Sequence, residues 1–409
     1  MEIINMTVSS TPSSVSISEA ICRALPSNYD FQIEDVITRA RKLKARHIGL
    51  QFPDGLLLYA TTIADIIRFF ADSCEVTVLG DVVYGACCID DLTARSLGVD
   101  FLVHFGHSCL VPVDQTTVRT MYVLVRIKWE VTHLIDSILA NFTTETQFSL
   151  QGTVQFSDSL EFVRSELERL GFDAEIPQSK PLGPGETLGC TSPFLRTDRT
   201  ILFVADGRFH LEAAMMANPN LAAFRYDPYV KRLFRESFDN VEMKRIRGLA
   251  VKAARKAKCV GLILGTLGRQ GSVGLLEGIR TLLQQRGVET FTVLMSEVEN
   301  EKLGKFGIDV DAWVQVACPR LSIDWGEFYS KPLLSSFEAF ACWGEDPEAE
   351  EMLESVSGTI PMDYYSNDGG PWANYTVLGG YGGTQTDKFW HMGPGKKLLK
   401  YETEQDARS

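Results

Sequence analysis

A parallel sheet covered by helices is first indicated by the run His47-Ile48-Gly49-Leu50-Gln51-Phe52-Pro53-Asp54-Gly55. Its first six residues form the short apolar run that a buried strand requires, and residues 53–55 are a turn signal. The apolar-periodic stretch 56–70 then predicts a helix. Further strands are expected at 75–79 and 101–105, with a helix over 90–97 between them. Strands that alternate with helices of this length predict a parallel sheet with both faces covered.

The same order of elements recurs twice further along the chain. The offset from Ile48 to Cys87 is 87 − 48 = 39, and that from Gln151 to Cys190 is 190 − 151 = 39, which indicates a duplicated unit. In a third unit the offset from Val260 to Cys318 is 318 − 260 = 58, and a helical insertion at 297–306 is expected to account for the difference. The second unit is expected to have strands at 152–156, 172–176 and 200–205 and a helix at 157–170; the third, strands at 259–264, 290–294 and 312–316 and a helix at 273–286.

The predicted fold class is α/β, with three similar Rossmann-like domains around a pseudo-threefold axis. The domains are expected at 31–145, 146–240 and 241–345, and each carries one of the three cysteines just named. Residues 1–30 are expected to be loosely ordered. Residues 346–409 lack periodicity and are rich in glycine, which predicts an irregular C-terminal extension.

Charge and hydropathy exclude several classes of protein. The chain has 409 residues and a formal net charge of −13, which disfavours nucleic acid as the direct partner because phosphate binding needs a basic face. The basic stretch 244–258 has helical spacing and is interpreted as a solvated helix face, with a docking surface for an acidic partner as the alternative. No apolar run approaches the ~18 residues that span a bilayer. We therefore expect a cytoplasmic protein without a membrane partner.

Three cysteines lie in loops that border predicted strands. If the domains pack around a common axis, the loops at the carboxyl ends of their strands meet, and Cys87, Cys190 and Cys318 form one site. Nine cysteines without a dense framework argue against disulfides and favour metal or redox chemistry. The other cysteines are interpreted as small buried hydrophobes: Cys22, Cys74, Cys259 and Cys342, and with less support Cys88 and Cys109.

Two metals suit three thiolates. A structural zinc site commonly draws two ligands from a CxxC-type pair and closes its fourth position, and the sequence has no such pair. Three cysteines on three domains suit a 4Fe-4S cluster better, with the fourth iron left open for a substrate. The residues alone leave both metals possible.

Four motifs resemble one known family. The similarity runs from about Leu25 to Trp372 and indicates subunit 1 of 2-(3-amino-3-carboxypropyl)histidine synthase, the enzyme of the first step of diphthamide synthesis. The sequence carries the motifs Tyr84-Gly85-Ala86-Cys87-Cys88, His104-Phe105-Gly106-His107-Ser108-Cys109, Leu188-Gly189-Cys190-Thr191-Ser192-Pro193 and Ala317-Cys318-Pro319-Arg320-Leu321-Ser322-Ile323-Asp324-Trp325-Gly326, with further likeness at 51–55 and 206–210.

The resemblance implies a 4Fe-4S cluster at the domain junction, held by Cys87, Cys190 and Cys318. It also implies a noncanonical radical reaction of the co-substrate S-adenosylmethionine, whose 3-amino-3-carboxypropyl group moves to C2 of a histidine on translation elongation factor 2. The implied partners are the sister subunit 2 in a heterodimer, a small iron-binding electron donor, and the elongation factor as protein substrate. Because all three cysteines are present, the chain resembles the catalytic subunit, with the archaeal homodimeric enzyme as a related possibility.

The amino acid end of S-adenosylmethionine needs charged partners near the open iron. The guanidinium groups among the candidates either capture the cofactor carboxylate or form ion pairs between domains, and the sequence does not separate these roles. The loop 265–271 lies between a strand and a helix and is expected at the cofactor pocket or the domain junction. The cofactor-binding candidates are Asp54, Arg208, Arg269, Gln270, Arg320 and Asp324.

His107 and His210 are the candidate catalytic residues. A histidine with a pKa near neutrality suits removal of the proton from the alkylated imidazole, although a structural histidine is the more frequent case. Two alternative functions are compatible with three such cysteines. One is a non-catalytic scaffold with a structural three-cysteine metal site; the other is an iron-sulfur Lewis-acid enzyme like quinolinate synthase, whose motifs do not match those quoted above.

Overall fold

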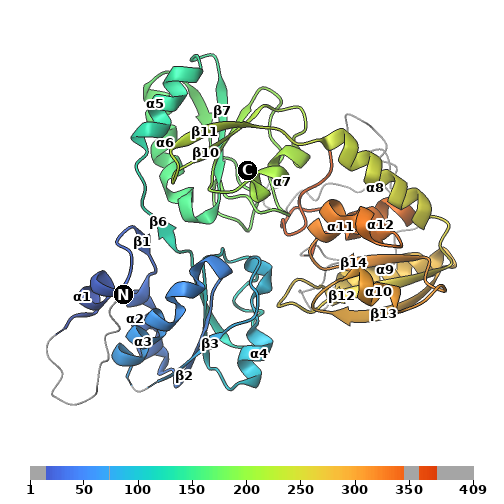
Figure 1. Cartoon of the computed structure of the whole chain (residues 1–409), viewed down its shortest axis with the longest axis horizontal. Helices are drawn as coiled ribbons and strands as arrows, with labels where there is room; N and C mark the ends of the chain where they lie inside the picture. The colour runs from blue at the N-terminus through green and yellow to red at the C-terminus, as the bar shows by residue number, and fades with distance from the viewer. Residues whose placement is uncertain (1–14, 73, 345–358, 375–409) are drawn as a thin grey trace, which may run out of the picture.

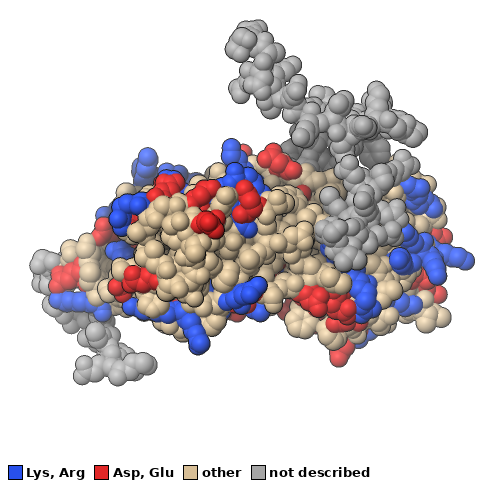
Figure 2. Space-filling model, turned by 90° about the horizontal axis from the view of Figure 1, so that it is seen from above, with Lys and Arg blue, Asp and Glu red and all other residues tan. Residues whose placement is uncertain are grey.

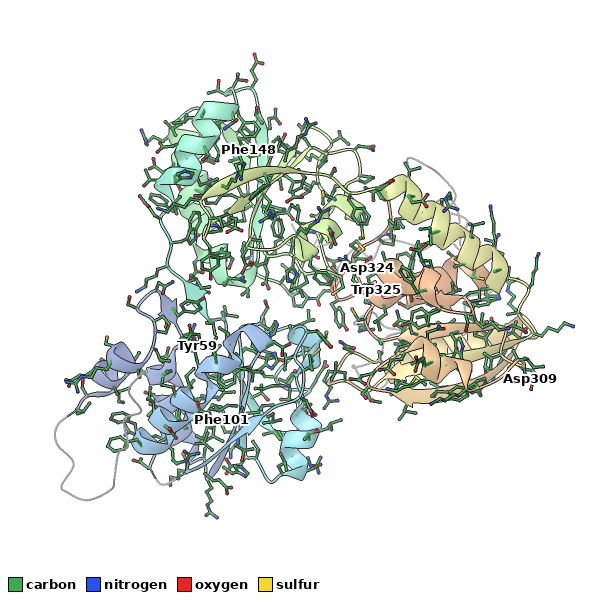
Figure 3. The ribbon with its side chains drawn as sticks, viewed as in Figure 1. Tyr59, Phe101, Phe148, Asp309, Asp324 and Trp325 are labelled. Atoms are coloured by element: carbon green, nitrogen blue, oxygen red, sulfur yellow. The ribbon has the colours of Figure 1, made fainter. Side chains whose placement is uncertain are left out.

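Three parallel sheets form the body of the molecule (Figure 1). The computed structural model describes residues 15–72, 74–344 and 359–374. The lobes built on the three sheets surround a common junction, as the expected α/β arrangement requires. Phe101 and Phe148 lie inside the first and second lobes, whereas Asp324 and Trp325 lie where the second and third lobes meet (Figure 3).

The first sheet has the strand order β3-β2-β4-β5, and all its pairs are parallel. Its two central strands are almost entirely buried, which is why they read as continuous apolar runs. The strands are β2 (His47–Gln51), β3 (Glu75–Leu79), β4 (Phe101–Phe105) and β5 (Arg119–Val123), and the helices are α2 (Ile33–Leu43), α3 (Ala60–Phe70) and α4 (Asp91–Ser96).

The second sheet has the order β11-β10-β9-β7-β8, in which only β11 is antiparallel to its neighbour. The expected strand at 152–156 was wrong, because that segment turns into the 3-10 helix η3 (Val154–Ser159), just as η1 (Asp54–Tyr59) follows β2. The elements are α5 (Thr132–Asn141), β7 (Gln147–Gly152), α6 (Leu160–Arg169), β8 (Asp173–Glu175), β9 (Thr200–Val204), α7 (Phe209–Ala217), β10 (Ala223–Asp227) and β11 (Arg232–Glu236).

The third sheet has the order β13-β12-β14-β15 and is parallel throughout. The expected insertion at 297–306 contains only the short helix α10. The elements are α8 (Asn240–Ala254), β12 (Cys259–Gly265), α9 (Val273–Gln285), β13 (Glu289–Met295), α10 (Asn300–Gly304), β14 (Ala312–Val316), α11 (Arg320–Trp325), β15 (Leu333–Leu334) and α12 (Ser336–Trp343).

The repeat predicted from the sequence is confirmed by the strand order, because each sheet places its second strand, then its first, third and fourth, side by side. The equal offset of 39 compared non-equivalent positions, since Ile48 is the second residue of β2 and Gln151 the fifth of β7. The larger offset in the third unit, 58 positions from Val260 to Cys318, is not explained by an insertion alone. Cys87 and Cys190 precede the third strand of their units, whereas Cys318 follows the third strand, β14.

The interpretation of the basic stretch as a solvated face is correct for most of its basic side chains and wrong for two of them. The exposed ones are Arg245, Lys252, Arg255, Lys256 and Lys258. Lys244 and Arg247 are buried, and Arg247 has no exposed surface. The Arg247 guanidinium binds the Glu338 carboxylate of α12, with Nε–Oε1 at 2.5 Å and Nη2–Oε2 at 2.8 Å, and also donates to the Leu333 carbonyl. The Arg247–Glu338 ion pair therefore connects α8 to α12. On the face shown in Figure 2, basic and acidic side chains are interspersed.

The first and last described segments of the chain, residues 15–30 and 359–374, pack onto the domains. Residues 15–30 contain α1 (Ile17–Ala24) and β1 (Tyr29–Asp30), and β1 pairs with β6 (Arg126–Ile127) of the first domain. Residues 359–374 form no helix, as expected for the extension, but they are packed into the core: Ile360, Met362, Tyr364, Tyr365 and Trp372 are buried. The rest of the extension and residues 1–14 lie outside the described residues. None of the described helices has the length and hydropathy needed to cross a membrane.

Candidate functional site

The thiols of Cys87, Cys190 and Cys318 occupy one neighbourhood. A hydrogen bond with Cys88, burial, and the charges of Cys88, Cys190 and Cys318 together raise the pKa of Cys87 well above its ordinary value. Burial and the charge of Cys318 raise the pKa of Cys190 to about 12, and burial raises that of Cys318 to about 11. Such mutual effects require proximity, so the fold brings together the cysteines of three domains.

The two candidate metals place different demands on the positions of these thiols. Among the described residues, no three His, Cys, Asp or Glu side chains are grouped so that they could hold one metal ion. A zinc ion needs its sulfur ligands at about 2.3 Å from one point. A 4Fe-4S cluster binds each thiolate through a different iron and therefore takes sulfurs that stand further apart. Cysteines from three separate loops suit the second description, and the choice between the two metals stays a prediction.

The loop between β12 and α9 presses against the Cys87–Cys88 turn. The Arg269 amide donates to the Cys87 carbonyl at 2.8 Å, and Gln270 Nε2 donates to Cys88 Sγ at 3.3 Å. Gly268 has φ +56°, and a Cβ there would lie 2.4 Å from the Cys88 carbonyl carbon. Only glycine fits both this conformation and this contact. The third domain thus fixes the position of a first-domain cysteine.

The Arg269 side chain adds an ion pair between the same two domains. Its Nε and Nη2 bind the two oxygens of Asp91 at 2.8 and 2.7 Å. Burial opposes ionisation of Asp91, but hydrogen bonds from Arg269 and Thr117 outweigh it and leave the pKa below its ordinary value. The buried Asp91 carboxylate is therefore ionised, and both of its oxygens accept hydrogen bonds from Arg269.

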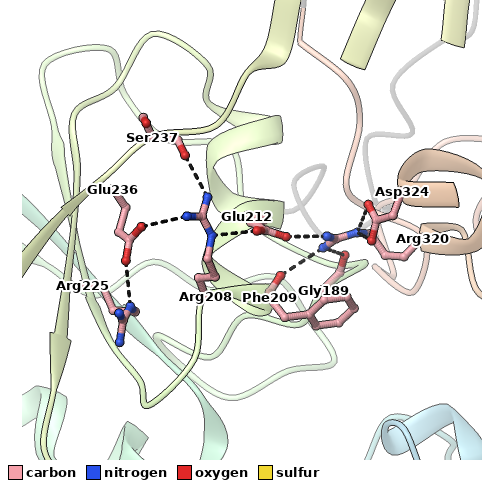
Figure 4. A network of polar contacts seen from close by, with 9 residues as sticks. All are labelled: Gly189, Arg208, Phe209, Glu212, Arg225, Glu236, Ser237, Arg320 and Asp324. Carbon is pink, nitrogen blue, oxygen red and sulfur yellow. Dashed lines mark hydrogen bonds and ion pairs between the residues drawn. The ribbon is translucent and has the colours of Figure 1, made fainter. Parts of the chain in front are cut away.

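A second network joins the third domain to the second (Figure 4). Arg320 lies two residues after Cys318, and its Nη2 binds Glu212 Oε2 on α7 at 2.6 Å. Its Nε binds Asp324 at 2.8 and 2.9 Å, and Nη1 donates to the Phe209 carbonyl at 3.0 Å. Glu212 also accepts from Arg208 Nε at 2.8 Å. Glu212 therefore bridges two arginines.

The six cofactor-binding candidates thus separate into two groups. Arg208, Arg269 and Arg320 hold protein carboxylates in the structure, and Asp324 and Gln270 belong to the same interdomain contacts. Asp54 lies apart from them, exposed at the start of η1. Some of these contacts lie within one domain, as for Arg208 with Glu212, and others join two domains, as for Arg269 with Asp91; a role in binding the cofactor stays a prediction.

The two candidate catalytic histidines, His107 of the first domain and His210 of the second, lie close enough for the charge of His210 to affect His107. Burial and the charge of His210 lower the pKa of His107 to about 4, and burial and Arg320 lower that of His210 to about 4. In both rings the buried Nδ1 has no hydrogen-bond partner. Both are therefore neutral at pH 7 and weaker bases than an ordinary histidine. Proton removal by either of them stays a prediction.

Several residues at the junction escaped the sequence interpretation. Glu186 is buried four residues before Cys190, where it accepts a hydrogen bond from Ser108 of the first domain and one from the Gly183 amide at 3.1 Å. Burial raises its pKa to about 7. Asp91 and Glu212 were also missed, because nothing local marks a carboxylate that pairs with an arginine more than 100 positions away. Among the other cysteines, Cys22 and Cys109 are exposed rather than buried.

A cavity of about 340 Å³ adjoins the Arg320 network. It lies between α7, α8 and α11, and its wall combines apolar side chains with carboxylates. The carboxylates favour a cationic group in this space. Its lining includes Glu212, Phe238, Met243, Arg320, Asp324 and Glu327.

Fold and site together define a class of proteins in which three parallel-sheet domains each bring one cysteine to a common junction. The chain belongs to the diphthamide synthesis family, since residues 52–353 match the family model described as "Putative diphthamide synthesis protein". The relative from Gibberella zeae, 2-(3-amino-3-carboxypropyl)histidine synthase subunit 1, is 48% identical over 354 residues, which cover 86% of this chain and 75% of the relative. The Mus musculus relative of the same name is 48% identical over 364 residues, covering 87% and 80%.

Solved structures agree with this family. Dph2 from Pyrococcus horikoshii has a TM-score of 0.66 and 27% identity, covering 78% of this chain and 91% of that chain. A second structure of the Pyrococcus protein, with a 4Fe-4S cluster, has the same TM-score and 26% identity. The resemblance deduced from the cysteine motifs is confirmed.

Proposed function

We propose that this chain is the cluster-bearing catalytic subunit that carries out the first step of diphthamide synthesis. The single observation that carries the proposal is the shared neighbourhood of Cys87, Cys190 and Cys318, one from each domain. It is supported by the name of the relatives and by the cluster in the Pyrococcus structure.

The residues present fit a 4Fe-4S cluster. These three neighbouring thiols, of which Cys87 is buried and the other two partly buried, all have raised pKa values and need a cationic centre before they can ionise together, and iron supplies it. When bound by Cys87, Cys190 and Cys318, the cluster would supply one electron to the sulfonium of S-adenosylmethionine, so that the bond to the methionine Cγ breaks and methylthioadenosine and a 3-amino-3-carboxypropyl radical form. That radical would add to C2 of a histidine on translation elongation factor 2, and the adduct would lose the C2 proton and return one electron to the oxidised cluster, which restores the aromatic imidazole.

The protein's own residues would position the reactants. Arg269 and Arg320 hold the first and second domains against the third on either side of the thiols. Such pairs keep the loops at fixed separations, which a reaction between held groups requires. His107 and His210, neutral at pH 7, present unpartnered Nδ1 atoms that can accept a proton from the alkylated imidazole. We propose the same junction as the binding site of S-adenosylmethionine.

The proposed partners follow from the family. Relatives named subunit 1 imply a further subunit, so we propose a heterodimer with the sister subunit 2. A small iron-binding protein would deliver the electron, and the elongation factor would be the protein substrate. These partners place the reaction in the cytoplasm.

Anaerobic electron paramagnetic resonance of the dithionite-reduced full chain tests the proposal. We expect a 4Fe-4S signal that S-adenosylmethionine perturbs and that Cys190→Ala abolishes. Cys259→Ala is the matched control, because Cys259 begins β12 and is partly exposed away from the other thiols. No iron signal after cluster reconstitution, or an unchanged signal in Cys190→Ala, would overturn the assignment and favour a non-catalytic scaffold.

A further inference from the structure

Residues 359–374, here called the C-terminal strap, are attached to the loop that carries Cys190. The Tyr364 amide donates to the Cys190 carbonyl at 3.3 Å, and the Ser192 amide donates to the Met362 carbonyl at 2.7 Å. An isolated β-bridge joins Thr191 to Asp363. The strap therefore extends the second domain's cysteine loop with a short strand-like contact.

The same strap is attached to the loop between β12 and α9. The Tyr365 hydroxyl donates to the Gln270 carbonyl at 3.3 Å, and Asn374 Nδ2 donates to the same oxygen at 3.1 Å. Gln270 in turn donates to Cys88 Sγ. The buried Tyr365 thus contacts the Cys190 loop directly and the Cys88 turn through Gln270, because its amide also donates to Thr191 Oγ1 at 3.2 Å, and that hydroxyl lies 3.7 Å from Cys190 Sγ.

Hydrogen bonds within the strap connect its two ends, and a further hydrogen bond attaches it to the third domain at a place away from the thiols. Asp363 accepts from the Trp372 indole at 2.6 Å and from the Gly370 amide at 2.9 Å, which closes a turn between the two ends of the strap. Tyr364 donates instead to Ser335 Oγ at 3.3 Å, at the start of α12. The hydroxyls of these neighbouring tyrosines therefore have different partners: that of Tyr365 binds the loop that contacts Cys88, and that of Tyr364 binds the residue before α12.

We propose that the C-terminal strap is part of the cysteine site, with Tyr365 as the positioning residue that holds the Cys190 and Cys88 loops in register through Thr191 and Gln270. The inference rests on the proposed cluster. Groups that hydrogen-bond to ligands fix the orientation of those ligands, and hydrogen bonds to the sulfurs tune the reduction potential. The Tyr365 hydroxyl binds the loop of Gln270 and the Tyr365 amide binds the loop of Thr191, so a small displacement of this residue moves both loops.

The test compares Tyr365→Phe with Tyr364→Phe in the full chain, reconstituted anaerobically with iron and sulfide. Each variant removes one buried hydroxyl from adjacent residues, so any general loss of packing is matched. We expect iron release to a ferrous chelator to be about 10-fold faster in Tyr365→Phe, the usual size of such indirect effects, and unchanged in Tyr364→Phe. The midpoint potential and the resonance line shape of the reduced cluster should shift in Tyr365→Phe alone.

A second variant keeps the test decisive. Asn374→Ala removes the other donor to the Gln270 carbonyl, and the double variant with Tyr365→Phe should release iron faster than either single variant. Equal iron release and equal potentials in Tyr365→Phe, Tyr364→Phe and the unmodified chain would overturn the inference while leaving the cluster in place. If the unmodified chain itself binds no iron, the proposed function fails, and this inference fails with it.

Discussion

Arg320 of the third domain and Glu212 of the second form an ion pair at 2.6 Å, with side chains only 5% and 18% exposed. Arg320 lies two residues after Cys318, and Glu212 lies on α7, the helix that follows β9. The Arg320 guanidinium also lies over the Phe209 ring, 4.2 Å from its centroid. Movement of the second domain relative to the third is therefore transmitted to Cys318.

Arg320→Gln should be strongly destabilising. The substitution leaves the Glu212 and Asp324 carboxylates near one another without their shared cation, and breaking a buried pair in this way costs about 3 to 5 kcal/mol. Denaturant unfolding of the full chain measures this loss. Arg208→Gln is the control, because Arg208 binds the same Glu212 but its side chain is 48% exposed, so the loss should be at most about 1 kcal/mol. Equal losses in the two variants would contradict the assigned importance of Arg320.

Gly268→Ala should disturb the Cys87–Cys88 turn. The new Cβ would lie within 2.4 Å of the Cys88 backbone, and the positive φ adds strain, so one of the two loops must move. We expect lower iron content after reconstitution and reduced stability. The control Gly278→Ala places a methyl group in open space on helix α9 and should raise the free energy of unfolding by about 0.5 to 1 kcal/mol. Full iron content in Gly268→Ala would show that the contact is dispensable.

The fold was largely predictable because its central strands are buried on both faces. The buried strands β4 and β14, and also the edge strand β3, have the predicted bounds, and the three-cysteine site was predicted from the loops that border such strands. The boundary of β7 was missed because Val154 and Phe156 are buried in the 3-10 helix η3, where they continue the apolar pattern beyond the strand.

The polar part of the junction was far less predictable. Asp91 pairs with Arg269 and Glu212 with Arg320, at separations of 178 and 108 positions, and no local pattern marks such partners. The C-terminal strap was expected to be irregular, which is correct for residues 359–374, but nothing in its composition placed it beside Cys190. Tertiary contacts, not local propensity, determine these positions.

Acid should destabilise the fold through His210. Its pKa of about 4 lies below the ordinary value of about 6.5, so the unfolded chain binds the proton more tightly and stability falls as pH drops below the unfolded-state pKa. The loss from this group should reach about 2 kcal/mol between pH 7 and pH 4.5. Thermal or denaturant unfolding of His210→Gln across this range should show a smaller loss than the unmodified chain. An unchanged acid dependence would mean that His210 is not buried as described.

The ionisation of Glu186 should change the free energy of unfolding with pH in the direction opposite to that of His210. Burial raises its pKa to about 7, so the folded state holds the proton more tightly than the unfolded chain, whose ordinary value is about 4.5. Stability from this group is therefore fully present below the unfolded-state pKa and is lost as pH rises through about 7, by about 3 kcal/mol in total. Because His107 and His210 change stability in the other direction over part of this range, the two effects partly cancel in the unmodified chain.

Comparison with Glu186→Gln isolates the contribution of the carboxyl. A glutamine keeps acceptor oxygen for Ser108 and is not charged at high pH, so Glu186→Gln should match the unmodified chain at pH 4.5 and exceed its unfolding free energy by about 3 kcal/mol at pH 8. Ser108→Ala removes the donor to the carboxylate but leaves the titrating group, so its pH dependence should persist while its stability at pH 8 falls further. Parallel stability curves for Glu186→Gln and the unmodified chain would show that folding leaves the pKa of Glu186 at its ordinary value, so that the carboxylate is ionised in the folded protein near neutral pH. In that case the contact between the first and second domains would contain a buried charge that Ser108 and the Gly183 amide are sufficient to stabilise.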